Sequence, residues 1–157
     1  MINFDQIRSN LFLGSCPKNI TDVTRLGQSL GITAVLNLQT DADFTKWGIE
    51  WDAIQAAYQQ HNITLFRVPI VDFDRDDLEQ RILDAGDMLD QILAVGHKAY
   101  VHCTAGMERA PATVISYLIQ ADALSLADAH AEVTSKRNCA PFVDVLERVF
   151  NQTVNAS

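Results

Sequence analysis

The sequence has few cysteines, little positive charge and no long hydrophobic run. Its three cysteines, Cys16, Cys103 and Cys139, stand far apart, which excludes a disulfide framework and a zinc site of the usual ligand spacing. Twelve Lys and Arg against 20 Asp and Glu give a net charge of −8, which disfavours nucleic acid and anionic membranes as partners. No apolar run approaches the roughly 20 residues of a membrane span, and the first residues lack a secretory signal pattern. We expect a cytoplasmic protein with reduced thiols.

Short β-rich runs alternate with amphipathic segments along the chain. Strands are predicted at residues 11–14, 32–38, 64–70 and 99–102, and helices at 22–30, 51–61, 111–123, 126–137 and 141–152. A longer helix follows an acidic loop, because apolar residues from Leu78 to Ile92 recur every three or four positions. Thr21 is the expected N-cap of the 22–30 helix. This alternation predicts the α/β class, with a central, mostly parallel sheet of about five strands flanked by helices, in a single domain over residues 1–157.

One strand–loop–helix segment, YVHCTAGMERAPATVISYL at residues 100–118, carries a chemical motif. Open α/β sheets bind ligands at the carboxyl ends of their strands, and the loop after His102 lies at such an end. Backbone N–H groups of this loop and the N-terminus of the following helix favour a phosphate dianion. The expected phosphate-binding residues are Thr104, Ala105, Gly106, Met107, Glu108 and Arg109.

Two side chains of this loop are predicted to act on the phosphate itself. Arg109 supplies a planar fork that can hold two oxygens. Cys103 stands in a field that stabilises its thiolate, the nucleophile for attack on phosphorus. Gly106 gives the loop conformational freedom, and His102 is expected to hydrogen-bond the loop and tune the thiolate. The alternative is a buried structural cysteine beside a solvated arginine.

The predicted reaction also needs a proton donor for the departing alkoxide. The loop VDFDRDD, residues 71–77, offers carboxyl groups at the end of another predicted strand. Asp72 comes first after that strand and is the preferred general acid, with Asp74 as the second choice. Asp76 and Asp77 are better explained as helix caps in a solvated turn.

At this point the residues match a known family. HCTAGMERAP resembles the Cys-x5-Arg signature of the cysteine phosphatases, specifically their dual-specificity branch. That branch usually takes its general acid from an Asp about thirty residues before the Cys, and Asp72 stands 31 residues before Cys103. Several stretches are similar to the plant glucan phosphatases, which release phosphate from starch, and more distantly to laforin. They are LGSC, LQTDADF, VDFD, CTAGM-RAPA and SKRNC-P, where a hyphen marks a residue of this chain that differs from the group. The resemblance implies a cysteine phosphatase fold and a phosphocysteine intermediate, with Asp72 as acid and then base and with no metal or cofactor.

For a glucan substrate we expect aromatic platforms, because sugar rings offer C–H faces and few charges. Phe73 and Trp47 are the candidate substrate-binding residues, and core packing is the alternative, above all for Trp47. Glu108 stands where the glucan group has Gly, and we expect its carboxylate to point outward, away from the dianion. Ala140 replaces an aromatic residue of that group. No carbohydrate-binding module is expected within residues 1–157.

Three functions therefore compete. The leading hypothesis is a phosphoric monoester hydrolase that acts on phosphorylated glucan or a related sugar phosphate. The alternative keeps this chemistry but acts on phosphotyrosine or phosphoserine/threonine in proteins. A phosphate-binding scaffold without catalysis normally lacks the nucleophile, the arginine or the acid, whereas Cys103, Arg109 and Asp72 are all present.

Overall fold

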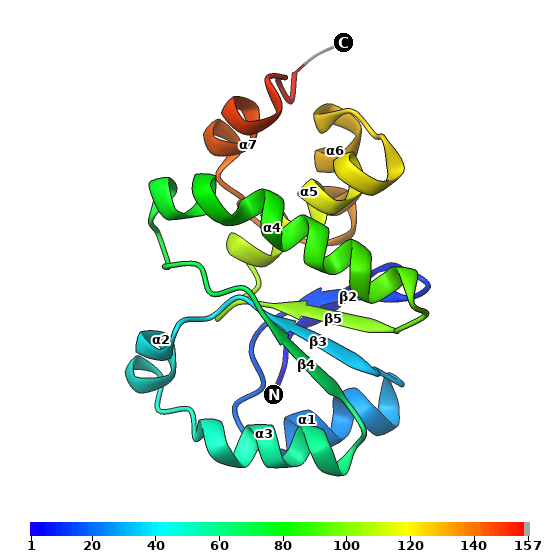
Figure 1. Ribbon diagram of the computed structural model, residues 1–157, viewed down its shortest axis with the longest axis vertical. Helices are drawn as coiled ribbons and strands as arrows, with labels where there is room; N and C mark the ends of the chain where they lie inside the picture. The colour runs from blue at the N-terminus through cyan, green and yellow to red at the C-terminus, as the bar shows by residue number, and fades with distance from the viewer. Residues whose placement is uncertain (156–157) are drawn as a thin grey trace.

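A five-stranded sheet forms the centre of the molecule in the computed structural model, which describes residues 1–155 (Figure 1). The strands are β1 (Phe4–Arg8), β2 (Leu11–Gly14), β3 (Ala34–Asn37), β4 (Thr64–Arg67) and β5 (Ala99–His102). Their order is β1-β2-β5-β3-β4, and β1–β2 is the antiparallel pair in an otherwise parallel sheet. The predicted α/β class with a mostly parallel sheet is confirmed.

Helices cover both faces of this sheet. They are α1 (Ile20–Thr24), which continues as a π-helical turn over Arg25–Ser29, α2 (Asp41–Lys46), α3 (Trp51–Gln60), α4 (Arg75–Ala94), α5 (Arg109–Asp122), α6 (Leu126–Lys136) and α7 (Val143–Phe150). In Figure 1, α4 to α7 lie above the sheet and α1 and α3 below it. No helix within residues 1–155 is long and apolar enough to cross a membrane.

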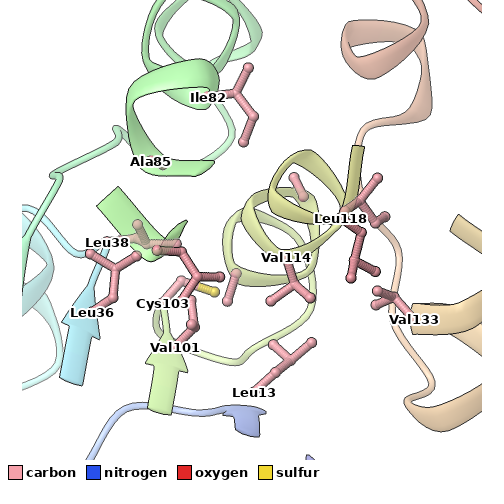
Figure 2. Close-up of a cluster of buried hydrophobic side chains, with 14 of the residues drawn as sticks. Leu13, Leu36, Leu38, Ile82, Ala85, Val101, Cys103, Val114, Leu118 and Val133 are labelled. Carbon is pink, nitrogen blue, oxygen red and sulfur yellow. The ribbon is translucent and has the colours of Figure 1, made fainter. Parts of the chain in front are cut away.

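The two faces of the sheet bury separate apolar clusters. Leu36 and Val101 face the larger cluster with α4, α5, α6 and α7, whereas their neighbours Val35 and Tyr100 face the cluster of α1 and α3. Because successive strand residues point to opposite faces, burial on both sides requires the continuous apolar runs seen in the sequence. Figure 2 shows the larger cluster, in which Cys103 lies between Leu36 and Val114.

Some element boundaries differ from the predictions for local reasons. β1 and α2 were not predicted, since β1 is an edge strand of mixed polarity and α2 has six residues. The N-cap of α1 is Asn19, whose side chain accepts from the Asp22 N–H, so the prediction of Thr21 as cap was wrong. The N-cap of α4 is Asp74.

The strand register places the loops that matter at one edge. Asn37 of β3 aligns with Arg67 of β4 and with His102 of β5, so three parallel strands end at the same level. The segments that follow them, residues 38–41, 68–74 and 103–108, therefore meet at the carboxyl edge of the sheet.

Candidate active site

Cys103 is the first residue after β5 and opens a loop that leads directly into α5. Its side chain is buried, with 3% exposed, at the base of a hollow of about 160 Å³. The hollow is lined by Lys46, Trp47, Asp72, Phe73, Cys103, Thr104, Ala105, Met107, Glu108 and Arg109. The structure thus brings the predicted nucleophile, arginine, acid and aromatic residues to one place.

The carbonyl groups of residues 104–107 all face away from this hollow, because each accepts a hydrogen bond from the surrounding scaffold. The backbone N–H of Cys16 donates to the Thr104 carbonyl at 2.9 Å. Arg137 donates to the next two carbonyls through Nη2 at 3.2 Å and Nε at 2.7 Å. The N–H of Ala140 donates to the Met107 carbonyl at 2.7 Å.

This arrangement orients the loop amides. In a trans peptide the N–H of one residue points opposite to the carbonyl of the preceding residue, and residues 1–155 contain no cis peptide. Outward carbonyls at 104–107 therefore direct the N–H groups of 105–108 inward. Among the described residues, no protein acceptor is bonded to those four N–H groups. Converging free amides at a helix N-terminus form an anion site.

Gly106 fits this loop for two physical reasons. Its φ of +69° lies in the left-handed region that favours glycine. A Cβ at this position would also lie 2.5 Å from the carbonyl carbon and oxygen of Gly14, at the end of β2. The glycine of the motif is thus required by the close packing of the loop on the neighbouring strand.

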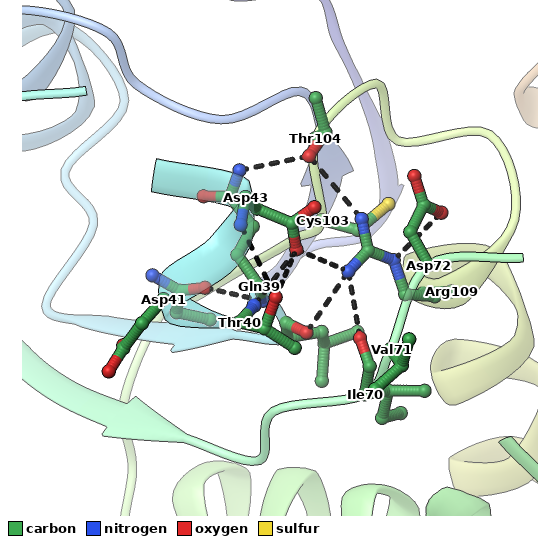
Figure 3. Close-up of polar contacts among 12 residues, drawn as sticks. Gln39, Thr40, Asp41, Asp43, Ile70, Val71, Asp72, Cys103, Thr104 and Arg109 are labelled. Carbon is green, nitrogen blue, oxygen red and sulfur yellow. Dashed lines mark hydrogen bonds and ion pairs between the residues drawn. The ribbon is translucent and has the colours of Figure 1, made fainter. Parts of the chain in front are cut away.

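Arg109 is the largest fully buried side chain, with 1% exposed, and one side of its guanidinium is fixed by protein oxygens. Nη1 donates to the Asp43 carboxylate and to the Ile70 carbonyl, both at 2.8 Å (Figure 3). These bonds hold the plane of the guanidinium in place. A fixed plane preserves the fork geometry that suits two phosphate oxygens.

The other edge of the Arg109 fork faces the hollow. Nη2 makes a long bond of 3.3 Å to the Thr104 hydroxyl, and Nε lies 3.3 Å from Asp72 Oδ1 without forming a well-aligned hydrogen bond. Figure 3 shows the Cys103 sulfur and Asp72 on this side of the guanidinium. The Nε–Nη2 edge is therefore the part of Arg109 that is available to an anion next to Cys103.

Asp43 is a functional residue that the sequence analysis did not single out. It is buried, and its carboxylate also accepts from the Thr40 N–H at 2.9 Å, which completes a capping box at the start of α2. Burial opposes ionisation, but the hydrogen bonds from Arg109 and from the Thr40 backbone outweigh it and hold the pKa of Asp43 below its usual value. The pattern Thr-x-x-Asp in LQTDADF was the available signal.

Arg137 is a second functional residue missed from the sequence. Its buried guanidinium, 4% exposed, bonds two loop carbonyls and the carboxylate of Asp5 at 3.0 Å. The stretch SKRNC-P contains it, but a local pattern does not reveal a contact with a loop 31 residues earlier.

The carboxylates of the acidic loop have distinct environments. Asp72 is partly exposed at the mouth of the hollow, beside Arg109. Asp74 caps α4 by accepting from the Asp77 N–H at 2.9 Å. Asp77 accepts from the Val71 N–H at 2.7 Å and so orients the residue before Asp72. Asp76 and Asp77 lie in the first turn of α4, in line with the expected acidic turn, and the N-cap of the helix is Asp74.

His102 is buried, and its ring makes one hydrogen bond within residues 1–155. Its Nδ1 lies 2.9 Å from the Cys103 carbonyl, which can only accept, so the neutral ring carries its proton on Nδ1. Burial lowers the pKa of His102 to about 4. His102 therefore bonds the first residue of the loop as a neutral ring at neutral pH.

Phe73 and Trp47 both lie at the mouth of the hollow and are not core residues. Phe73 is 74% exposed and Trp47 is 48% exposed. Phe73 also has a φ of +59°, an uncommon conformation for a bulky residue. The alternative of core packing is excluded for both aromatic side chains.

Glu108 does not point into solvent, contrary to expectation. The residue is 8% exposed, and Oε1 accepts from the Phe142 N–H at 3.4 Å. Burial is the main cause that raises the pKa of Glu108 to about 7. The segment after α6 folds over the loop and encloses this side chain, which no local sequence pattern reveals.

A larger hollow of about 460 Å³ lies elsewhere, between the start of α1 and the connection from α2 to α3. It is lined by Lys18, Asn19, Ile20, Thr21, Gly48, Glu50, Ala53 and Ile54. None of the predicted site residues lies in it, so volume alone does not identify the site.

Comparison with known proteins agrees with this geometry. The family model "Dual specificity phosphatase, catalytic domain" matches residues 11–144. The chain belongs to this family. The match confirms the predicted class of catalytic domain, that of a cysteine-based phosphoric monoester hydrolase.

The similar curated proteins include two plant phosphoglucan phosphatases and laforin. The chain is 34% identical to the amyloplastic phosphoglucan phosphatase DSP4 of Castanea sativa, covering 93% of this chain and 39% of the relative. It is 33% identical to the chloroplastic phosphoglucan phosphatase LSF1 of Arabidopsis thaliana, covering 89% of this chain and 24% of that relative. Laforin of Mus musculus is 31% identical, and the match covers 74% of this chain and 38% of laforin. The chain thus spans well under half of each relative.

The solved structures support the fold. The crystal structure of Tk-PTP in its active form superposes with a TM-score of 0.77 at 20% identity and covers 94% of this chain and 96% of that one. At this identity the likeness shows the architecture alone. The roles of individual side chains are argued below from their geometry.

Proposed function

We propose that this domain hydrolyses phosphate monoesters through a phosphocysteine intermediate. The convergence of three kinds of donor on the Cys103 sulfur supports the proposal: the inward amides of residues 105–108, the start of α5 and the free edge of Arg109. These donors neutralise a dianion and hold it in line with the thiolate. Cys103, Arg109 and Asp72 are the proposed catalytic residues, and residues 104–109 bind the phosphate.

In the first step Cys103 Sγ attacks phosphorus, the S–P bond forms and the P–O bond to the leaving alcohol breaks. Asp72 stands at the mouth of the hollow, where the leaving oxygen emerges, and gives it a proton. Arg109 keeps its hydrogen bonds through Nη1. Its Nε and Nη2 groups exchange their contacts with Asp72 and Thr104 for hydrogen bonds to the phosphoryl oxygens.

In the second step a water molecule attacks phosphorus and the S–P bond breaks. Asp72 now takes a proton from that water and returns to its acid form. The cysteine leaves as a thiolate, stabilised by the same amides. Ala110, the residue after the arginine, offers no hydroxyl to assist this departure, so we expect the second step to be slower than in relatives that carry Ser or Thr there.

We propose phosphorylated glucan, or a related sugar phosphate, as the substrate. The phosphoglucan phosphatases among the relatives support this class. Trp47 and Phe73 line the hollow with exposed aromatic side chains, and Met107, which is also exposed, adds apolar surface to its lining. Such a rim suits the C–H faces of sugar rings. The net charge of −8 suits a sparsely phosphorylated, nearly neutral polymer better than a dense polyanion.

The remaining proposals concern partners, compartment and domain extent. We propose that the domain does not bind nucleic acid, because its composition is acidic. The three cysteines within residues 1–155 are free thiols, which fits a reducing compartment such as the cytoplasm. Two relatives carry plastid names, and imaging of a fluorescently tagged protein tests the cytoplasmic proposal against that alternative. We propose that residues 1–157 belong to one catalytic domain.

The test compares phosphate release from phosphorylated amylopectin, from an aryl phosphate and from a phosphotyrosine peptide. Cys103→Ser serves as the blank and is expected to lose activity by about a thousandfold or more. Glucan turnover comparable with aryl phosphate turnover is the expected result. Activity on the peptide but not on amylopectin would replace the proposed substrate by a phosphoprotein and keep the chemistry.

A substitution at the rim sharpens this test. Phe73→Ala should reduce glucan turnover about tenfold while aryl phosphate turnover changes much less, because a single aryl ring offers the rim far less contact area than a chain of sugar rings. Val95→Ala is the matched control, since Val95 is 75% exposed and lies after α4, outside the hollow. Equal effects of Phe73→Ala on both substrates would argue against a sugar platform.

A further inference from the structure

The loop of residues 103–108, the phosphate loop, contains a carboxyl group that the proposed reaction does not use. Glu108 supplies the last of the inward N–H groups, directly precedes Arg109 in the chain and is one of the residues that line the hollow. It is 8% exposed, and its one side-chain hydrogen bond among residues 1–155 is the 3.4 Å bond from the Phe142 N–H. This buried carboxyl group therefore belongs to a residue of the loop into which the dianion would bind.

The cations near Glu108 are engaged by other carboxylates. Arg109 is paired with Asp43 at 2.8 Å and lies 3.3 Å from Asp72. Arg75, at the start of α4, is paired with Asp144 at 3.0 Å. Within residues 1–155, Glu108 forms no ion pair of its own.

Each element packed around Glu108 contributes to its charge state. Burial raises the pKa to about 7, and the negative charge of Asp72 on the acidic loop acts in the same direction. The Phe142 N–H from the segment before α7, Arg109 of α5 and Arg75 of α4 oppose this rise. The carboxyl group is therefore close to half protonated at neutral pH before any anion arrives.

A dianion in the loop adds negative charge beside this buried group. Ionised Glu108 and the anion repel each other, and because Glu108 is only 8% exposed, solvent screens this repulsion little, whereas the neutral acid does not oppose binding. By linkage, a group that is more readily protonated in the complex takes up a proton on binding.

We propose that Glu108 is a positioning residue that couples phosphate binding to the uptake of one proton from solvent. The anion occupies the loop together with a neutral Glu108 carboxyl group, whose bond to the Phe142 N–H keeps the segment before α7 closed over the loop. This inference rests on the proposed phosphate site at Cys103 and Arg109 but not on a glucan substrate.

The affinity of the loop for the anion should therefore fall as the pH rises. Below pH 7 the carboxyl group is largely neutral in the free protein, so binding needs no extra proton. Above pH 7 the free protein has lost that proton, and affinity falls by up to about tenfold for each further pH unit. The effect acts on binding, so it enters KM and inhibition constants and leaves kcat nearly unchanged.

Sulfate is the appropriate probe, because its own charge stays constant between pH 6.0 and 8.5. Its inhibition constant is measured against an aryl phosphate for the wild type, Glu108→Gln and Asp76→Asn. In the wild type the constant should rise at least tenfold more from pH 6.0 to 8.5 than in Glu108→Gln, which imitates the neutral acid. Asp76→Asn removes the same charge from an exposed position and should follow the wild type.

Two outcomes would overturn the proposal: an unchanged pH dependence in Glu108→Gln, or equal loss of sulfate binding by that variant at every pH. The first would show that Glu108 does not titrate with binding, and the second that it only supports the fold. Calorimetry of sulfate binding to the wild type at pH 8, in two buffers of different ionisation enthalpy, needs no variant and no turnover. Uptake of one proton is expected, and no uptake would reject the coupling even if the domain proved inactive on every ester.

Discussion

Arg109 and Asp43 form a buried ion pair, with Arg109 Nη1 2.8 Å from Asp43 Oδ2, that joins the phosphate loop to α2. The side chains are 1% and 7% exposed, so water screens the pair little. The pair uses the side of the guanidinium opposite to the hollow. Asp43 thereby orients Arg109, the proposed catalytic arginine, from outside the hollow in which the phosphate is proposed to bind.

Removal of the Asp43 carboxylate should leave a buried arginine without its partner. We expect Asp43→Ala to lower the free energy of unfolding by about 3 kcal/mol and to raise the inhibition constant of sulfate at least tenfold. Urea unfolding and inhibition kinetics measure the two effects. Asp41→Ala is the control, because Asp41 pairs with Arg67 at 88% exposure and such pairs contribute about 1 kcal/mol or less. Equal effects of the two variants would contradict the positioning role.

The general acid can be identified by the leaving group. Asp72→Asn should reduce kcat about a hundredfold on an alkyl phosphate, whose alkoxide needs a proton, and much less on p-nitrophenyl phosphate. Steady-state rates on both esters provide the comparison. Asp74→Asn keeps a good N-cap on α4 and should retain activity on both. Loss of alkyl phosphate turnover in Asp74→Asn alone would transfer the role to Asp74.

The loop glycine should be intolerant of any side chain. Gly106→Ala places a Cβ 2.5 Å from the Gly14 carbonyl at a φ of +69°, so we expect sulfate binding to be lost and the free energy of unfolding to fall by about 2 kcal/mol. Gly96→Ala is the matched control, since Gly96 has a φ of +94° and open space around it. If both variants retain sulfate binding, close packing does not define the loop.

His102 should make stability depend on pH. Its pKa is lowered from 6.5 to about 4, so the unfolded chain binds the proton first and stability falls as the pH drops from 7 to 4. The contribution is about 3 kcal/mol. Because the pKa of Glu108 is raised from 4.5 to about 7, its contribution is present at low pH and lost as the pH rises, which opposes that of His102.

The His102 contribution therefore has to be measured as a difference. Urea unfolding of the wild type and of His102→Asn at pH 7 and at pH 4.5 isolates it, since Glu108 is common to both proteins. Asn can still donate to the Cys103 carbonyl, which keeps the hydrogen bond of the ring. The stability advantage of the wild type should shrink by roughly 2 kcal/mol at the lower pH. An unchanged difference would show that His102 is protonated in the folded state.

Much of the fold was predictable because its signals are local. Strand residues buried on both faces give apolar runs such as residues 34–36 in β3, and α4 shows its stripe from Leu78 to Ile92. β1 escaped prediction because an edge strand has one paired side and tolerates polar residues. The N-cap of α1 was misplaced because Asn19 and Thr21 are both good caps and stand two residues apart.

The sequence by itself determined the strand–loop–helix motif, since Cys103, Gly106 and Arg109 lie within one short segment and their spacing carries the chemistry. Only the tertiary structure decided what surrounds that segment. Asp43 and Arg137 reach it from 66 and 31 residues away, respectively, through bonds that depend on how α2 and the segment after α6 pack. The same packing encloses Glu108, which the sequence placed in solvent. Local spacing fixes which groups a loop contains, whereas burial and long-range hydrogen bonds fix their orientation and charge.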